Sequence, residues 1–195
     1  MGQSWSKMRK YLEQECICES LKGRIQYFLT RYKKSHDQEG RVAIRLDGKE
    51  IFKSCFYDWA IKRNQVVKDF VIPDGENVTY NEYWERVHLE TRNIGGLDQY
   101  SFYNAFYSYQ NCSIQESLEH IDPVVRLFAI FDRRVGKRRL VNISPNVFTQ
   151  PEWLQVFYKI RFEAEAIRFA TQNTPNELIQ DIEIYSQSLH HDTPH

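Results

Sequence analysis

The stretch RVAIRLDGKEIFKSC, residues 41–55, decides the fold class of this chain. Every second side chain in its first half is apolar: Val42, Ile44 and Leu46. This period of two is typical of a β-strand that buries one face. Asp47 and Gly48 follow, and this dipeptide tolerates the positive backbone dihedrals of a two-residue hairpin. The sequence therefore predicts two antiparallel strands joined at Asp47 and Gly48.

Two further elements are expected on the N-terminal side of this hairpin. After Gly23 the same alternation predicts another strand, with one face formed by Ile25, Tyr27 and Leu29. The three strands then make an antiparallel meander. Closer to the N-terminus the apolar period lengthens to three and four residues, which predicts a short helix. Its stripe comprises Trp5, Met8, Leu12 and Cys16.

The pattern after residue 56 is mainly helical. Four helix starts combine a hydroxyl side chain with a Glu three positions later, the spacing of a capping box. These pairs are Thr79 with Glu82, Ser113 with Glu116, Thr149 with Glu152, and Thr174 with Glu177. Gly95 and Gly96 are expected to end the helix that begins near Tyr80. Periodicity leaves the structure of residues 64–78 open, because the stretch VVKDFVIP is too short to decide between strand and loop.

Apolar side chains at helical spacing indicate which helices pack inward. One stripe comprises Trp153, Val156, Phe157, Ile160, Ala164 and Ile167, and a second comprises Leu178, Ile182, Tyr185 and Leu189. The run QYSFYNAFYSYQ, residues 99–110, is aromatic on both sides, with Tyr103, Phe106 and Tyr107 expected on one face and Phe102 and Tyr109 on the other. Such a helix is either buried or keeps one face for a partner.

These elements predict an α+β fold. It has an N-terminal helix, a three-stranded antiparallel β-meander, and a mainly helical C-terminal two-thirds packed as one domain. We expect residues 1–189 to form this single domain and residues 190–195 to be a flexible C-terminal tail. The length of 195 residues and the 42% share of hydrophobic residues suit one domain with a sizeable core.

Composition excludes several functional classes. The 26 basic and 26 acidic side chains balance, unlike those of a protein that binds polyanions over its whole surface. No apolar run approaches the length of a membrane span, and the N-terminus lacks the apolar centre of a signal peptide. We therefore expect a cytoplasmic protein with no membrane partner. The four cysteines have neither disulfide nor zinc spacing, so they are interpreted as reduced thiols.

The most charged segment is DRRVGKRRL, residues 132–140. In the structural interpretation, a helix from Pro123 ends at Gly136, where its dipole favours nearby cations, and Asp132 pairs with a neighbouring Arg. Residues 138–143 would then continue as a short strand or an extended link toward Pro145. In the functional interpretation, the clustered cations bind a partner or an anion. The candidate partner- or anion-binding residues are Arg133, Arg134, Lys137, Arg138 and Arg139.

No motif in the chain specifies a reaction, and no catalytic residue, cofactor or metal ion is predicted. The histidines lack metal-ligand spacing, the glycines form no phosphate loop, and Glu163 and Glu165 are typical of a solvated helix face. The leading hypothesis is a non-enzymatic module that binds another protein. Two alternatives stay open: a nucleic-acid-associated protein that uses the basic patch at residues 133–139, and a hydrolase with an unrecognised site. Oligomeric state is not predicted.

Three blocks of the sequence carry a resemblance to a known family. WSKMRKYLE, YKKSHDQEGRVAIRLDGKEI and FAIFDRRVGKRRL occur in the same order in an uncharacterised family of small bacterial cytosolic proteins, which this chain resembles over most of its length. The resemblance implies a bacterial, cytosolic protein. It implies no activity and assigns no functional residue.

Overall fold

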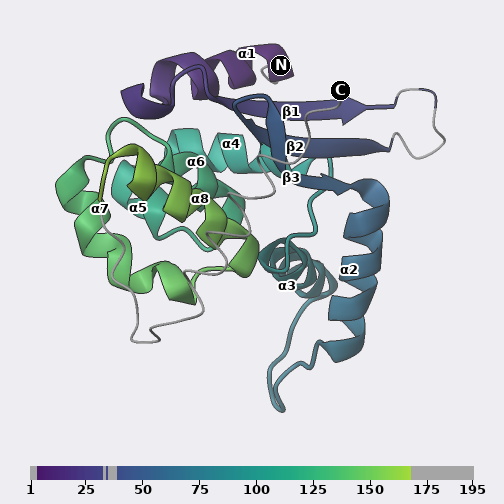
Figure 1. The fold of residues 1–195 in the computed structure, drawn as a ribbon. Coiled ribbons are helices and arrows are strands. Elements are labelled where there is room, and N and C mark those ends of the chain that lie inside the picture. Colours follow the sequence, from purple (N-terminus) through teal and green to yellow (C-terminus); the bar gives the residue numbers. More distant parts are fainter. Residues whose placement is uncertain (1–3, 33, 35–38, 168–195) are drawn as a thin grey trace, which may run out of the picture.

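A computed structural model of the chain describes residues 4–32, 34 and 39–167. The predicted helix at Thr174, its apolar stripe and the predicted tail at residues 190–195 lie outside these ranges. The α+β class is confirmed: an N-terminal helical segment precedes a three-stranded antiparallel sheet, and helical segments follow it (Figure 1). In the part of the chain that the structure describes, no helix is both long and apolar enough to cross a membrane.

The sheet has the order β1-β2-β3 and consists of β1 (Ile25–Arg31), β2 (Gly40–Leu46) and β3 (Lys49–Cys55). Asp47 and Gly48 connect the last two strands with φ angles of 51° and 83°, as the two-residue hairpin requires. The predicted meander is therefore confirmed. One irregularity in the β2–β3 register falls between Ile44 and Arg45.

The N-terminal segment begins with α1 (Trp5–Lys10), which widens into a π-helix over Tyr11–Cys16. Met8, Leu12 and Cys16 of the predicted stripe are buried, and Trp5 packs partly against the core. A short 3-10 turn, Glu19–Leu21, then leads into β1. Figure 1 shows this segment beside β1, with α4, α6 and α8 gathered on the other side of the sheet region.

The C-terminal two-thirds is helical, in agreement with the prediction. Its helices are α2 (Phe56–Asp69), α3 (Tyr80–Asn93), α4 (Ser101–Asn111), α5 (Ile114–Leu118), α6 (Pro123–Ile130), α7 (Lys137–Ile143) and α8 (Glu152–Ala164), with a 3-10 helix at Ser144–Thr149. The stretch left open by the sequence, residues 64–78, consists of the last six residues of α2 followed by an irregular connection to α3. Gly95, at φ 77°, follows the end of α3, so the predicted stop is confirmed.

The capping boxes at Thr79 and Ser113 are confirmed, since each side chain accepts from the backbone of the Glu three residues on. The predicted start at Thr149 is wrong. Thr149 lies in the preceding 3-10 helix, where its hydroxyl donates to the Asn146 carbonyl at 2.8 Å, and α8 begins at Glu152 after Pro151. The proline fixes the helix start two residues later than the hydroxyl pattern suggests.

The core is centred on α6, in which every residue except Arg126 is buried. Against it packs the aromatic helix α4, whose buried face consists of Phe102, Ala105, Phe106 and Tyr109. The prediction that grouped Phe106 with Tyr107 is therefore wrong, because Tyr107 is 38% exposed. Positions three, four and seven residues apart share the inward face, and Tyr107 falls outside that set.

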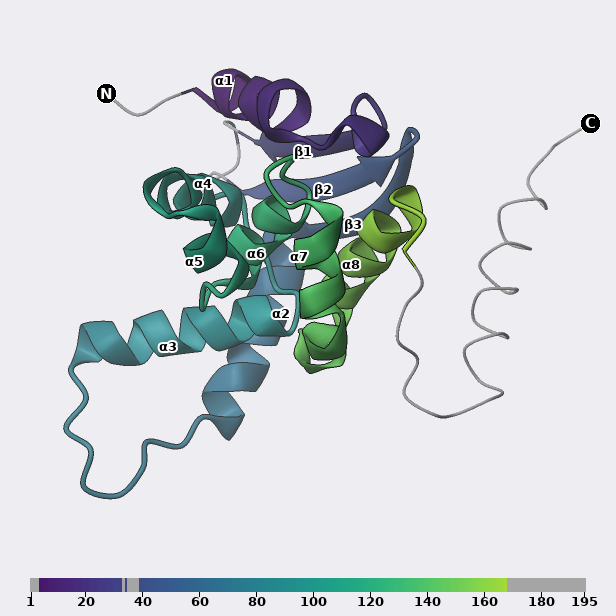
Figure 2. The ribbon, with the colours of Figure 1, turned by 90° about the vertical axis from the view of Figure 1, so that its left-hand side faces the viewer.

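Helices α2 and α3 form an arm, residues 56–93, that extends away from the rest of the molecule (Figure 2). Helix α2 has no buried residue, and α3 buries only Val87 and Thr91. The two helices contact each other through aromatic rings, and the His88 ring lies 5.8 Å from that of Trp59 and 5.9 Å from that of Trp84. We call these residues the α2–α3 arm.

Candidate functional site

The structure places the basic segment differently from the prediction. Helix α6 ends at Ile130, residues 131–135 form a tight turn, and Gly136 is the N-cap of α7. The predicted helix to Gly136 is therefore wrong, and so is the extended course predicted for residues 138–143, which lie in α7. The physical reason is Asp132: its Oδ1 accepts from the backbone N–H of Arg134 at 2.7 Å, which stabilises a turn in place of a further helical turn.

This correction removes the helix-end explanation for most of the cations. Lys137, Arg138 and Arg139 lie in the first turn of α7, where the helix dipole opposes positive charge. Arg133 and Arg134 lie beyond the end of α6. The local helix electrostatics therefore do not account for this concentration of positive charge.

A polar cluster of Asp132, Tyr109 and Arg134 stabilises the turn on the side that faces the core. The Asp132 side chain is fully buried, and its Oδ2 accepts hydrogen bonds from the Tyr109 hydroxyl and from Arg134 Nη2 and Nε, the last two at 2.7 and 2.9 Å. The Arg134 guanidinium also lies 5.8 Å from the Tyr109 ring centre. Burial, followed by the hydrogen bond to Asp132, raises the pKa of Tyr109 far above its usual value, so this hydroxyl keeps its proton. The expected pairing of Asp132 with a neighbouring Arg is confirmed.

The N-terminal segment holds the same turn from a second side. The Arg133 N–H donates to the Cys16 carbonyl at 2.7 Å, and the Cys18 N–H donates to the Phe131 carbonyl at 2.8 Å. Burial raises the pKa of the Cys16 thiol, and a hydrogen bond with Cys16 raises the pKa of Tyr11 to about 12. Cys16 is therefore a buried, protonated structural thiol.

Helix α8 holds the turn from a third side through Arg161, which is 2% exposed. Its Nη2 donates to the Val135 carbonyl at 3.0 Å, and its Nη1 donates to the Ser20 hydroxyl at 3.1 Å and pairs with Glu165. Ser20 in turn donates to Glu165 at 2.7 Å. The sequence pattern did not indicate Arg161 as part of the site, and the prediction that Glu165 is a solvated side chain differs from its contacts with Arg161 and Ser20. The available signal was spacing, because Arg161 shares the buried face of α8 with Leu154, Phe157, Tyr158 and Phe162.

The predicted cations divide into two groups. Arg134 is engaged by Asp132, and Arg139 is half-buried and donates to the Arg134 carbonyl at 3.2 Å. Arg133, Lys137 and Arg138 are exposed, and in residues 4–32, 34 and 39–167 none of them forms an ion pair. We call the three exposed residues, Arg133, Lys137 and Arg138, the basic surface.

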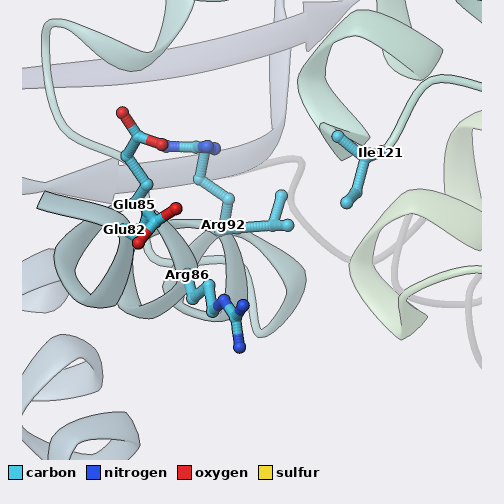
Figure 3. Close-up of a pocket in the computed structure, with 6 residues that line it drawn as sticks. Glu82, Glu85, Arg86, Arg92 and Ile121 are labelled. Atoms are coloured by element: carbon cyan, nitrogen blue, oxygen red, sulfur yellow. The ribbon is translucent and has the colours of Figure 1, made fainter. Parts of the chain in front are cut away.

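A second candidate is a groove of about 370 Å³ along α3, with Ile121 on its other side (Figure 3). Its arginines are engaged: Arg92 Nε lies 3.0 Å from Asp122 Oδ2, and Arg86 Nη2 lies 2.5 Å from Glu76 Oε1. Asp122 also caps α6 by accepting from the Val124 N–H at 2.9 Å. Among the residues described, no group of three or more His, Cys, Asp and Glu side chains is placed to hold a metal ion.

The fold and this surface define the class of the molecule: an α+β domain that presents exposed cations on a turn and at the start of the helix that follows it. The chain belongs to the SF0329 protein family, whose sequence pattern matches residues 4–162. No curated protein and no solved structure matches the chain. The matched range includes the whole basic surface and the contacts from Cys16, Tyr109 and Arg161 that hold it.

Proposed function

We propose that this chain is a non-enzymatic module that binds an acidic segment of another protein through the basic surface. The observation that carries the proposal is the set of exposed cations at Arg133, Lys137 and Arg138, which have no ion-pair partner among the described residues. Clustered arginines bind carboxylates with two parallel hydrogen bonds each, so an acidic peptide complements this surface in charge and geometry.

The rigidity of the turn supports the same function. Its backbone is bonded to the N-terminal segment at Cys16 and Cys18, and to α8 through Arg161. A binding surface whose backbone is already ordered loses less conformational entropy when it captures a partner. The backbone that carries the cations is therefore already ordered before a partner binds, and the long cationic side chains are exposed to solvent.

The balance of charge favours a protein partner over a nucleic acid. A nucleic-acid-binding domain typically has a basic stripe and an overall excess of positive charge, whereas this chain has 26 basic and 26 acidic residues. The basic surface is confined to one turn and the start of one helix. Nucleic-acid binding is the alternative outcome of the experiment below. The groove along α3 gives the hydrolase alternative no specific support, because its arginines are paired.

The proposal includes the bacterial cytosol as the place of action, as the sequence resemblance implies. Support comes from Cys16, Cys18, Cys55 and Cys112, all of which are free thiols. Free thiols suit a reducing compartment.

The experiment compares Arg133→Ala plus Arg138→Ala with the wild-type chain in binding to a fluorescent glutamate-rich peptide and to a single-stranded oligonucleotide. We expect the peptide affinity to fall about tenfold in the double variant, because two exposed charge-assisted contacts of about 0.7 kcal/mol each add to about 1.4 kcal/mol. The matched control, Lys49→Ala plus Lys53→Ala, removes two exposed cations of β3 and is expected to bind normally. Equal peptide binding by both double variants contradicts the proposal. Tighter binding of the oligonucleotide, lost in the first variant, supports the nucleic-acid alternative.

A further inference from the structure

The end of the α2–α3 arm is both apolar and acidic. In the connection between its two helices, Val71 is 80% exposed and Ile72 is 37% exposed. Asp69 and Asp74 lie on either side of them in the sequence, and both carboxylates are exposed. Within the part of the chain that the structure describes, neither of them forms an ion pair. We call residues 69–75 the arm tip.

The backbone of the arm tip is held in place although its side chains are uncovered. The Glu76 N–H donates to the Pro73 carbonyl at 3.1 Å and closes a tight turn. Helix α3 holds both ends of the connection, because the Phe70 ring lies 5.4 Å from the Tyr83 ring and Arg86 Nη2 lies 2.5 Å from Glu76 Oε1. A partner that binds the arm tip therefore has little backbone to order.

The charges of the arm tip and of the basic surface are both placed unfavourably within their own helices. Asp69 is the last residue of α2, where the helix dipole opposes negative charge. Lys137 and Arg138 lie in the first turn of α7, where the dipole opposes positive charge. Contact between these carboxylates and cations compensates both placements.

The two surfaces also match in their apolar side chains. The carboxylates of the arm tip flank Val71 and Ile72. On α7, Val141 lies one turn after Lys137 on the same helix face and is 55% exposed. An acidic tip with apolar side chains thus complements a cationic surface with an apolar side chain.

The arm tip and the basic surface of one molecule lie far apart. The arm extends away from the rest of the molecule, and its tip is well separated from α7 in both views (Figures 1 and 2). The base of the arm is tied to α8, because Trp153 Nε1 donates to the Arg92 carbonyl at 2.9 Å. A contact between the arm tip and the basic surface therefore requires two molecules.

We propose that the arm tip of one molecule binds the basic surface of a second copy of this chain. Asp69 and Asp74 pair with the cations of that copy, and Val71 packs against its Val141. This inference rests on the proposed function, because it names the acidic segment that the basic surface binds. The contact is small and its ion pairs are exposed, so the association is weak and decreases as the salt concentration rises.

The contact is tested on the full chain by sedimentation equilibrium at chain concentrations from micromolar to millimolar. We expect the wild-type chain to self-associate, and Asp69→Asn plus Asp74→Asn to raise the dissociation constant about tenfold, because two exposed ion pairs are lost. The matched control, Glu85→Gln plus Glu90→Gln, removes the same charge from exposed positions of α3 and is expected to behave like the wild-type chain. A wild-type chain that stays monomeric over the whole range overturns the proposal, as does an equal loss in both double variants.

A mixing experiment tests whether the arm tip and the basic surface are partners of each other. Arg133→Ala plus Arg138→Ala keeps the arm tip and weakens the basic surface, whereas the Asp69 and Asp74 variant has the opposite defect. We expect the equimolar mixture to associate about tenfold more tightly than either variant alone, because only the mixed pair combines an intact tip with an intact surface. A mixture that associates no more tightly than the separate variants overturns the proposal.

The glutamate-rich peptide separates this inference from the proposed function. The Asp69 and Asp74 variant keeps the basic surface, so its peptide binding tests that surface alone. Peptide binding by a chain that stays monomeric supports the proposed function and overturns the inference. Self-association that depends on the arm tip, without peptide binding, supports the inference and contradicts the binding of a different protein. If the chain neither binds the peptide nor self-associates, both proposals are wrong.

Discussion

The Asp132 carboxylate accepts a hydrogen bond from the Tyr109 hydroxyl inside the core, directly beneath the basic turn. The first residue follows α6 and the second lies on α4, so the bond fixes the turn relative to the aromatic helix. A buried carboxylate needs its partners, because an unpaired charge in the interior is strongly destabilising. The buried Asp132 carboxylate thus stabilises the turn from which the cations of the basic surface project.

Replacing Asp132 by Ala is expected to lower the free energy of unfolding by about 3 kcal/mol, since it leaves the buried Tyr109 hydroxyl without its acceptor and removes the turn's own cap. Tyr109→Phe, which removes one hydrogen bond and keeps the ring, should cost about 1 kcal/mol. Urea unfolding followed by tryptophan fluorescence measures both values. A loss for Asp132→Ala no larger than for Tyr109→Phe would show that the turn does not depend on the carboxylate.

Arg161→Met is expected to destabilise the chain by about 3 kcal/mol, because it leaves Glu165 and the Val135 carbonyl without their buried donor. Lys159→Met on the same helix is the control, and it should change the unfolding free energy by less than about 0.5 kcal/mol. The readout is the midpoint of urea unfolding. A stable Arg161→Met chain would mean that apolar packing replaces the ion pair without loss.

Gly40 at the start of β2 has no room for a side chain. A Cβ there would lie 2.3 Å from the Thr30 carbonyl oxygen and 2.7 Å from Gln99 Cβ. We expect Gly40→Ala to lower stability by about 2 kcal/mol or more through overpacking. Gly136→Ser is the control, because nothing lies within 4 Å of a Cβ at Gly136, and serine is a favoured N-cap residue. Thermal unfolding compares the two, and equal melting temperatures would refute the steric argument.

The free energy of unfolding is expected to decrease as the pH is lowered, and His88 contributes to this decrease. Burial first, and then the charge of Arg92, lower its pKa, with a smaller contribution from Arg63 and an opposing one from Asp98. Because the folded-state pKa is the lower one, the unfolded chain binds the proton first as the pH falls. The contribution of neutral His88 is therefore complete above the unfolded value of about 6.5 and is lost as the pH decreases through it towards the folded value.

The measurement is urea unfolding at several pH values between about 7.5 and 5.5, a window chosen around the unfolded histidine pKa. His88→Gln is expected to flatten the decrease in unfolding free energy that the wild-type chain shows in this window. Parallel curves for the two chains would exclude His88 as a source of the acid sensitivity.

Local chemistry explains why the meander and several helix starts could be predicted. Asp47 and Gly48 specify their hairpin without help from distant residues, and Thr79 and Ser113 cap helices with partners three positions away. The basic turn differs because it depends on contacts with Ile17 and Tyr109, which are distant in sequence. Its apolar spacing still suggests a longer helix, since Phe131 and Val135 are buried within the turn.

The sequence predicted the cations of the candidate site but not the buried residues that hold the turn. Its five cations could be named from composition, but the separation of Arg134 from the exposed residues depends on the geometry of the buried Asp132 carboxylate. Arg161 was missed because its partners, Ser20 and Val135, come from two other parts of the chain. A charged residue on an otherwise apolar helix face is the signal that could have indicated it.

The junction of the N-terminal segment, the basic turn and α8 also constrains the order of folding during synthesis. Residues 16–20, 132–135 and 161–165 meet there, so the first of these segments leaves the ribosome long before its partners exist. Contacts of such long sequence separation form slowly. The N-terminal helix packs its aromatic side chains Trp5 and Tyr11 against Phe102 and Phe106 of α4, so its apolar side stays uncovered until α4 has been synthesised. Until then the nascent chain exposes apolar surface that favours aggregation and chaperone binding.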